Sequence, residues 1–178
     1  MGKITSGKGT QAEMLKEKLN LPIFSTGDQV RSASKLTTPF GKRMKETYEE
    51  GLLIPEWIAE YWMMHGLLVE HNDSGLIFEG VAKKPDEARL LHEIHEWLGR
   101  SYVVFNLEIP DEVVKERTVK RSRDEVDSLK VMETRLSEYR KYTEESLNVF
   151  REKGTLIDID GTSSIEEVKE KIFKHLGI

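Results

Sequence analysis

The sequence contains no cysteine, five prolines among 178 residues, and no apolar run long enough to cross a bilayer. The lack of cysteine excludes disulfides, Cys-ligated zinc and thiol chemistry, and it favours a cytoplasmic protein. The longest apolar stretch, at 62–69, is interrupted by His65 and Gly66, so we expect no membrane partner. The cationic start leads into glycines rather than an apolar segment, so we expect no signal peptide.

Positive charge is also in deficit, because the net charge is −5. This balance excludes a general nucleic-acid binder, so nucleic acid is not an expected partner. An anionic ligand must instead be held by local positive charge, for which the segment KERTVKRSR at 115–123 is the densest candidate. A hydrophobic content of 38% over this length fits a single globular domain at 1–178 rather than a disordered chain.

Strand-like and helix-like segments alternate along the chain, which predicts an α/β fold with a parallel sheet. We expect strands at 22–25, 75–80, 102–109 and 155–159, the third being typical of a sheet buried on both faces. We expect about seven helices at apolar spacings of three and four residues. The three tryptophans are expected in the hydrophobic core: Trp57, Trp62 and Trp97.

A glycine-rich stretch near the start has the pattern G-x-x-x-x-G-K, from Gly2 to Lys8. Its glycines allow backbone N–H groups to converge on phosphate oxygens, and the positive end of the following helix adds to the attraction. The lysine can reach the terminal phosphates as a point charge. The pattern predicts an ATP site formed by Gly2, Ser6, Gly7, Lys8, Gly9 and Thr10. A glycine-rich helix start with an exposed lysine remains the alternative.

Several arginines leave two interpretations open when taken one by one. Arg31 follows the sequence Thr-Gly-Asp and either contacts a phosphate or is a solvated residue behind a helix cap. Arg117 and Arg121 lie four residues apart and therefore share one helix face. They either close on one polyphosphate chain or form an exposed basic face.

The segments SGKGTQ (6–11) and FSTGDQVR (24–31) resemble the adenylate kinase family of nucleoside monophosphate kinases. The resemblance continues in register through EEGLLIP, GLIFEG, ERTVKR, ETRLSEYRKYT and LIDIDGTSSIEEV, and it covers essentially the whole chain. It implies a P-loop NTPase three-layer sandwich with parallel strand order 2-3-1-4-5 and an acceptor-binding insertion at about 26–55. The implied reaction is phosphoryl transfer from Mg-ATP to AMP, which gives two ADP.

The resemblance also implies residue roles. Transfer requires cations where charge spreads over the moving phosphoryl group, and the implied catalytic set is Lys8, Lys83, Arg121, Arg123 and Arg135. Arg117 joins the ATP site. The acceptor nucleotide would contact Thr26, Arg31, Ile54, Gly80, Lys83 and Glu87. Glu79 would hold Mg²⁺ through water, since Mg²⁺ prefers oxygen ligands and keeps several waters.

The first strand of the family pattern is not visible in this sequence. It should supply about five or six apolar residues before Gly2, at the centre of the sheet. Without it, two neighbouring strands would leave their backbone groups unpaired. Either residues that belong before Gly2 are missing, or another segment fills the place. We favour the first explanation, because the later core looks intact.

Three further departures affect the activity. Lys83 replaces an arginine, and an ammonium cannot grip two oxygens as a planar fork does. Glu87 replaces a base-reading glutamine, which leaves a CMP or UMP kinase as an alternative. The lid is nearly deleted, at about 121–124, so either ATP hydrolysis leaks or a homo-oligomer closes the site. A non-catalytic nucleotide-binding module is the remaining alternative.

Overall fold

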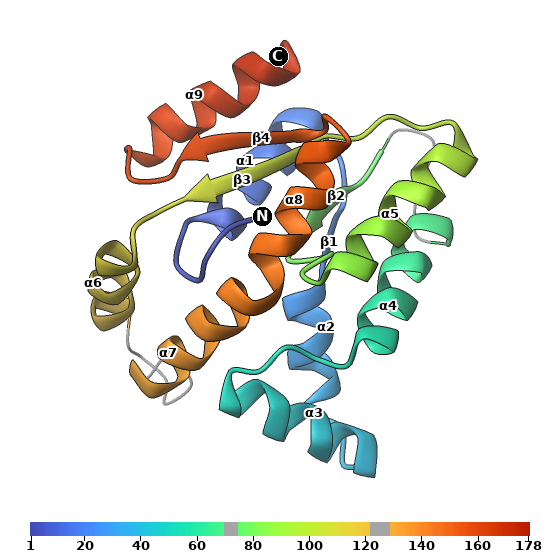
Figure 1. The fold of residues 1–178 in the computed structure, drawn as a ribbon, viewed down its shortest axis with the longest axis vertical. Coiled ribbons are helices and arrows are strands. Elements are labelled where there is room, and N and C mark those ends of the chain that lie inside the picture. Colours follow the sequence, from blue (N-terminus) through green and yellow to red (C-terminus); the bar gives the residue numbers. More distant parts are fainter. Residues whose placement is uncertain (70–74, 122–128) are drawn as a thin grey trace.

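The computed structural model describes residues 1–69, 75–121 and 129–178. Helices surround two short pairs of parallel strands, and α2 and α3 extend away from them (Figure 1). The elements of these residues are α1 (Lys8–Leu19), β1 (Ile23–Ser25), α2 (Thr26–Ala33), α3 (Pro39–Glu50), α4 (Glu56–Leu68), β2 (Ile77–Glu79), α5 (Pro85–Leu98), β3 (Val104–Glu108), α6 (Asp111–Arg121), α7 (Leu129–Glu138), the π-helical turn η2 (Tyr139–Thr143), α8 (Glu144–Glu152), β4 (Leu156–Asp160) and α9 (Ile165–Leu176).

The strands form two separate parallel pairs. β1 pairs with β2, with Ile23 opposite Ile77, and β3 pairs with β4, with Val104 opposite Leu156. Three strands fall within the ranges predicted from the sequence, and β4 extends one residue beyond the predicted 155–159, to Asp160. In the family order 2-3-1-4-5, the β1–β2 pair corresponds to strands 2 and 3, and the β3–β4 pair corresponds to strands 4 and 5. Between the pairs, the described residues form no complete strand at the central position.

Helices cover the strands on both sides. Leu15 of α1 and Ile172 of α9 pack with Leu107 of β3 in one cluster. Phe150 of α8 belongs to a second cluster, which packs against Val104 of β3. Because successive side chains of a strand point to opposite faces, these two clusters lie on opposite sides of β3. The predicted α/β three-layer arrangement is therefore confirmed.

Met1 and Gly2 lie beside β3, at the position expected for the end of the central strand. The Leu107 N–H donates to the Met1 carbonyl over 3.0 Å, and the Met1 amino group donates to the Phe105 carbonyl. Gly2 forms an isolated parallel bridge with Leu107. At this position, where φ is +127°, a Cβ would lie 2.5 Å from the Leu107 carbonyl oxygen, so the close approach requires glycine.

A cavity of about 650 Å³ lies between β2 and β3. Its apolar walls come from α1, β2, β3, α5 and α9, and include Ala12, Leu15, Phe78, Leu91, Phe105 and Ile172. Ile77 donates to Pro22 on the β1 side, so the peptide groups of Phe78 face the cavity instead.

The tryptophan prediction is wrong for two of three residues. Trp57 on α4 is 66% exposed and Trp97 on α5 is 83% exposed, whereas Trp62 packs against a core cluster of α2, α3 and α4. Apolar spacing alone does not distinguish the inner from the outer face of a helix that is apolar on both, and α4 is such a helix.

The buried amino group of Met1 predicts a pH-dependent stability. Burial, with the nearby Lys8 ammonium, lowers the pKa of this amine from 8.0 to about 5. Between these values the unfolded chain binds more protons than the folded chain, so the free energy of unfolding should rise with pH. Across the window the rise is on the order of 4 kcal/mol. Urea unfolding of the 1–178 chain at pH 5, 6, 7 and 8 measures it.

Acetylation of the Met1 amine provides the matched control, because it removes the titrating group and leaves every side chain in place. The acetylated chain should lose this rise with pH. Equal pH dependence for the two forms would show that the amine is solvated and free to ionise in the folded chain.

Candidate active site

The glycine-rich loop folds around Lys8, the lysine predicted to bind phosphate. Lys8 Nζ donates to the Lys3 carbonyl over 2.6 Å and lies 3.4 Å from Ser6 Oγ. Ser6 is buried, and Gly7 takes the left-handed conformation just before α1. Gly9 and Thr10 occupy the exposed first turn of α1. The ammonium therefore sits across the loop at the positive end of a helix, where an anion is favoured.

Two cations fasten this loop to the rest of the fold. Lys3 Nζ donates to Asp111 Oδ1 over 2.6 Å and to the Ile109 carbonyl over 3.1 Å. The hydrogen bond from Lys3 lowers the pKa of the Asp111 carboxyl. Arg117 of α6 donates to the Thr5 carbonyl at 3.3 Å and to the Gly161 carbonyl at 3.0 Å. Arg117 thus borders the loop, while its ATP-binding role stays a prediction.

Glu79 ends β2, and its carboxylate is held by a neighbouring strand. Ser25 Oγ donates to Glu79 Oε2 over 2.9 Å and accepts the Asp28 N–H, which caps α2. Glu79 and Lys8 line the same cavity. The helix cap considered as the alternative at this segment is therefore present, with Ser25 as the capping residue, whereas its hydrogen bond to Glu79 was not predicted.

The residues around Glu79 fit a hydrated magnesium ion. No group of three or more His, Cys, Asp or Glu side chains gathers as a metal site within 1–69, 75–121 and 129–178. A metal near Glu79 would therefore be held by one carboxylate, by waters and by substrate phosphates. This is how Mg²⁺ usually binds beside nucleotides.

Lys83 and Glu87 lie together behind Glu79. The Lys83 ammonium is buried although the residue is partly exposed, and this burial lowers its pKa, with Glu79 and Glu87 opposing and Arg135 adding to the effect. Glu87 Oε2 accepts the Lys83 backbone N–H over 2.8 Å. Burial raises the pKa of Glu87, against hydrogen bonds from the backbone of Lys83 and Lys84. The structure therefore places Lys83, Glu79, Glu87 and Arg135 in one electrostatic cluster.

Glu87 also has a structural task that the sequence analysis overlooked. It stands three residues after Lys84, the residue that precedes α5, and its carboxylate reaches back to the backbone before the helix. A glutamate at the third position of a helix can reach back in this way, but Lys84 offers no capping side chain, so the Ser/Thr-x-x-Glu signal of a capping box is absent from the sequence. The capping role and the predicted contact with the acceptor base compete for the same carboxylate.

Two residues predicted to contact the acceptor nucleotide lie at α2, and the predicted catalytic residue Arg135 lies on α7. Arg31 pairs with Asp28 at 2.6 Å and is half exposed, while Thr26 is buried at the first turn of α2. The Arg135 guanidinium lies 5.4 Å from the centre of the Tyr48 ring, which links α7 to α3.

The remaining predicted site residues lie at the following positions. Ile54 is buried, and its carbonyl accepts Lys84 Nζ at 3.2 Å. Gly80 follows β2 with φ at +72°. Arg121 is the last residue of α6. Arg123 and most of the predicted lid at 121–124 lie outside the described residues.

Taken together, the glycine loop with its lysine, the carboxylate at the end of β2 and the cations around both define a nucleotide-binding protein of the P-loop class. The adenylate kinase family model matches residues 1–155. The chain therefore belongs to the adenylate kinase family, whose members are nucleoside monophosphate kinases. No helix of the described residues is long and apolar enough to span a membrane.

Individual relatives agree with this assignment over nearly their full length. An adenylate kinase of Azobacteroides pseudotrichonymphae is 32% identical over 175 residues, covering 96% of this chain and 92% of the relative. An adenylate kinase of Synechococcus is 34% identical, covering 97% and 91%. Adenylate kinase 1 of Nostoc is 33% identical, covering 99% and 96%.

Proposed function

We propose that this protein transfers the terminal phosphoryl group of Mg-ATP to AMP, reversibly, to give two ADP. The observation that carries the proposal is the position of Lys8, held 2.6 Å from the Lys3 carbonyl and lining the same cavity as Glu79. A phosphate cradled by the loop would meet the ammonium on one side and a metal-holding carboxylate on the other. Family membership favours AMP over CMP or UMP as the acceptor.

The catalytic work is positioning and charge neutralisation, because the acceptor is already a phosphate anion. Lys8 and the loop N–H groups would bind the donor phosphates beside Arg117. Lys83 and Arg31 would orient the acceptor phosphate, and Arg121, Arg123 and Arg135 would stabilise charge on the group in transfer. Mg²⁺ bound through Glu79 would supply further positive charge at the donor phosphates.

The remaining parts of the proposal concern partners and location. With a net charge of −5, the protein is expected to bind nucleotides and not nucleic acid. The absence of cysteine supports a cytoplasmic location. We also propose a homo-oligomer, in keeping with the short lid predicted at 121–124.

A coupled assay of ADP formation with AMP, CMP and UMP in parallel tests the reaction. ADP production that depends on AMP supports the proposal. Equal rates with CMP or UMP favour the alternative kinase, equal rates without any acceptor indicate hydrolysis, and ATP binding without turnover indicates a binding module. Each of the last three results contradicts transfer to AMP.

Glu87→Gln should lower KM for AMP about fivefold, the equivalent of one added hydrogen bond of about 1 kcal/mol. The amide oxygen can still accept the Lys83 N–H, and the amide N–H₂ can donate to a ring nitrogen, which an ionised carboxylate cannot do. Glu93→Gln, on the exposed face of the same helix, is the matched control. An unchanged KM in Glu87→Gln would remove this residue from the acceptor site.

A further inference from the structure

Lys3 belongs to the glycine-rich phosphate loop at 2–8, but its side chain leaves the loop in a different direction from that of Lys8. Lys8 lines the cavity between β2 and β3, whereas Lys3 lines a separate hollow of about 690 Å³ between the ends of β3 and β4 and the helical turns η2 and α8. There the Lys3 ammonium donates to Asp111 and to the Ile109 carbonyl. It also lies 5.9 Å from the centre of the Tyr139 ring. The protein itself therefore supplies the partners of this cation.

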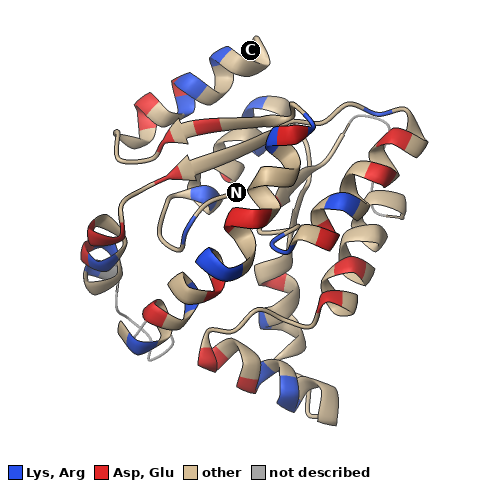
Figure 2. Cartoon of the chain, viewed as in Figure 1, with Lys and Arg blue, Asp and Glu red and all other residues tan. Residues whose placement is uncertain are grey.

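Asp111 connects the loop to a second basic segment. Its Oδ1 accepts Lys3 Nζ at 2.6 Å, and its Oδ2 accepts the guanidinium of Arg140 on η2. Figure 2 shows acidic residues at the start of α6 and basic residues on the loop and on η2, the three segments that these bonds connect. One carboxylate thus joins the loop to α6 and to the helical segment that carries Arg135, a residue of the predicted catalytic set.

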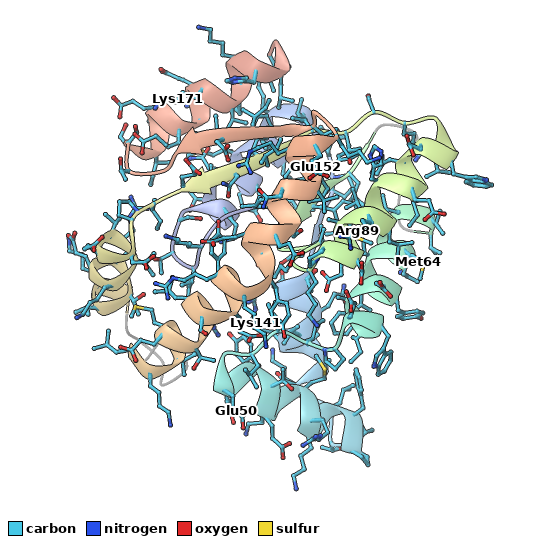
Figure 3. All side chains as sticks on the ribbon, in the orientation of Figure 1. Glu50, Met64, Arg89, Lys141, Glu152 and Lys171 are labelled. Atoms are coloured by element: carbon cyan, nitrogen blue, oxygen red, sulfur yellow. The ribbon has the colours of Figure 1, made fainter. Side chains whose placement is uncertain are left out.

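The next residue along η2, Lys141, makes a different contact. Its ammonium lies 4.7 Å from the centre of the Tyr142 ring, and its side chain lies toward α3 in Figure 3. Neighbouring cations of this helical turn therefore serve different elements. The contact with Asp111 depends on the position of Arg140 and not on a general positive charge of η2.

The ion pair of Lys3 and Asp111 is more enclosed than an ordinary surface pair. Its side chains are 19% and 33% exposed, against 52% and 61% for Lys16 and Glu13 on α1. An exposed pair contributes little, because water and salt screen its charges and its long side chains stay mobile. The enclosed pair, with the additional bond to a backbone carbonyl, holds the Lys3 side chain in one geometry.

A fixed Lys3 side chain also restrains the Lys3 peptide group, which organises the loop. The Lys3 carbonyl accepts the Lys8 ammonium at 2.6 Å and the Ser6 N–H at 3.3 Å. A loop that is held in this way has its ammonium and N–H groups in place before a nucleotide arrives. Less conformational freedom is then lost on binding, and the affinity for the nucleotide is higher.

We propose that Lys3 and Asp111 are positioning residues of the donor site, whose ion pair fixes the phosphate loop so that Lys8 and the loop N–H groups are placed for the phosphates of Mg-ATP. The inference rests on the proposed function. Asp111 acts through the Lys3 side chain, and Lys3 acts through its own backbone, so neither side chain touches the nucleotide.

Calorimetric titration of the full chain with Mg-ATP, together with the coupled ADP assay, tests the inference. Lys3→Met and Asp111→Ala should each weaken Mg-ATP binding about tenfold and raise KM for Mg-ATP by a similar factor, the effect of losing one charge-assisted hydrogen bond. KM for AMP should stay the same, and kcat should fall by less than about threefold, because the pair supports the donor loop alone. A merely structural role would lower the melting temperature and the active fraction, and would leave KM unchanged.

Two further variants and two controls complete the test. Lys3→Arg should restore Mg-ATP binding, because a guanidinium also pairs with a carboxylate. The double variant of Lys3→Met and Asp111→Ala should bind as weakly as either single variant, because both changes remove the same interaction. Lys16→Met and Glu13→Ala break the exposed pair on α1 and should bind Mg-ATP as the natural chain does.

The possible failures can be told apart. Weaker binding in Lys3→Met with unchanged binding in Asp111→Ala would mean that the ammonium acts on the nucleotide directly, which contradicts a positioning role. Unchanged binding in both variants, in a chain that still phosphorylates AMP, would overturn this inference and leave the proposed function in place. A natural chain that binds no Mg-ATP would overturn both.

Discussion

A chain extended before Met1 by five aliphatic residues, such as Ile-Ile-Val-Val-Leu, should unfold about 10 to 20 °C above the 1–178 chain. The extension would continue the parallel pairing that Met1 and Gly2 already make with β3. Its side chains would fill the cavity of about 650 Å³ between the two strand pairs. Each buried aliphatic side chain contributes about 1.5 to 3 kcal/mol, so a gain of about 5 kcal/mol remains after the entropy of ordering the strand.

Hydrogen bonding adds to the effect of filling the cavity. The peptide groups of Phe78 on β2 and the N–H of Phe105 on β3 would gain partners along the new strand, while the Phe105 carbonyl would keep its bond to the Met1 nitrogen. The titrating amine at Met1 would become a peptide N–H, so the rise of stability between pH 5 and 8 should also disappear. The melting temperature and its pH dependence are therefore two independent measurements of whether the added strand inserts between β2 and β3.

An extension of five Gly and Ser residues serves as the control, because it has the same length but no side chains to bury. Thermal unfolding followed by circular dichroism compares it with the aliphatic extension. If both extensions shift the melting temperature equally, the cavity does not accept a strand, and β2 and β3 do not face one another as an open pair.

The strands and the order of the elements could be predicted because their signals are local. A short apolar run such as 102–109 reads as a buried strand without knowledge of its neighbours, and β3 was found there. The phosphate loop is equally local, since seven consecutive residues bring Lys8 against the Lys3 carbonyl. Patterns within a few residues determine these features, so the sequence alone was sufficient.

The errors concern contacts between distant segments. Trp57 and Trp97 were expected in the core because their helices are apolar, but only packing determines which face of a helix is inward. The hydrogen bond from Ser25 to Glu79 joins residues 54 positions apart, and no pattern on either strand announces it. Glu87 is different: its contact with the Lys83 backbone is local, but Lys84 at the helix start does not give the Ser/Thr-x-x-Glu signal, and the family resemblance implied another role.

Replacing Lys8 by methionine should reduce kcat for AMP phosphorylation by a factor of 10² to 10³, roughly the effect of removing one preorganised donor to charge that develops in a transition state. The ammonium lies within the phosphate loop, and no other described lysine lies across that loop in the same way. Methionine has a similar length and fills the same space, so the loop and α1 should keep their conformation. A coupled ADP assay at saturating AMP and Mg-ATP measures the change.

Lys16→Met, on the exposed side of the same helix, is the matched control and should leave kcat unchanged. The melting temperature of both variants separates lost charge from lost folding. AMP affinity provides the second readout, because Lys8 is assigned to the donor phosphates and its loss should leave acceptor binding intact. Full turnover in Lys8→Met would mean that the donor phosphates bind away from the loop, since an ammonium held this close to a transferred phosphoryl group cannot be removed without raising the barrier.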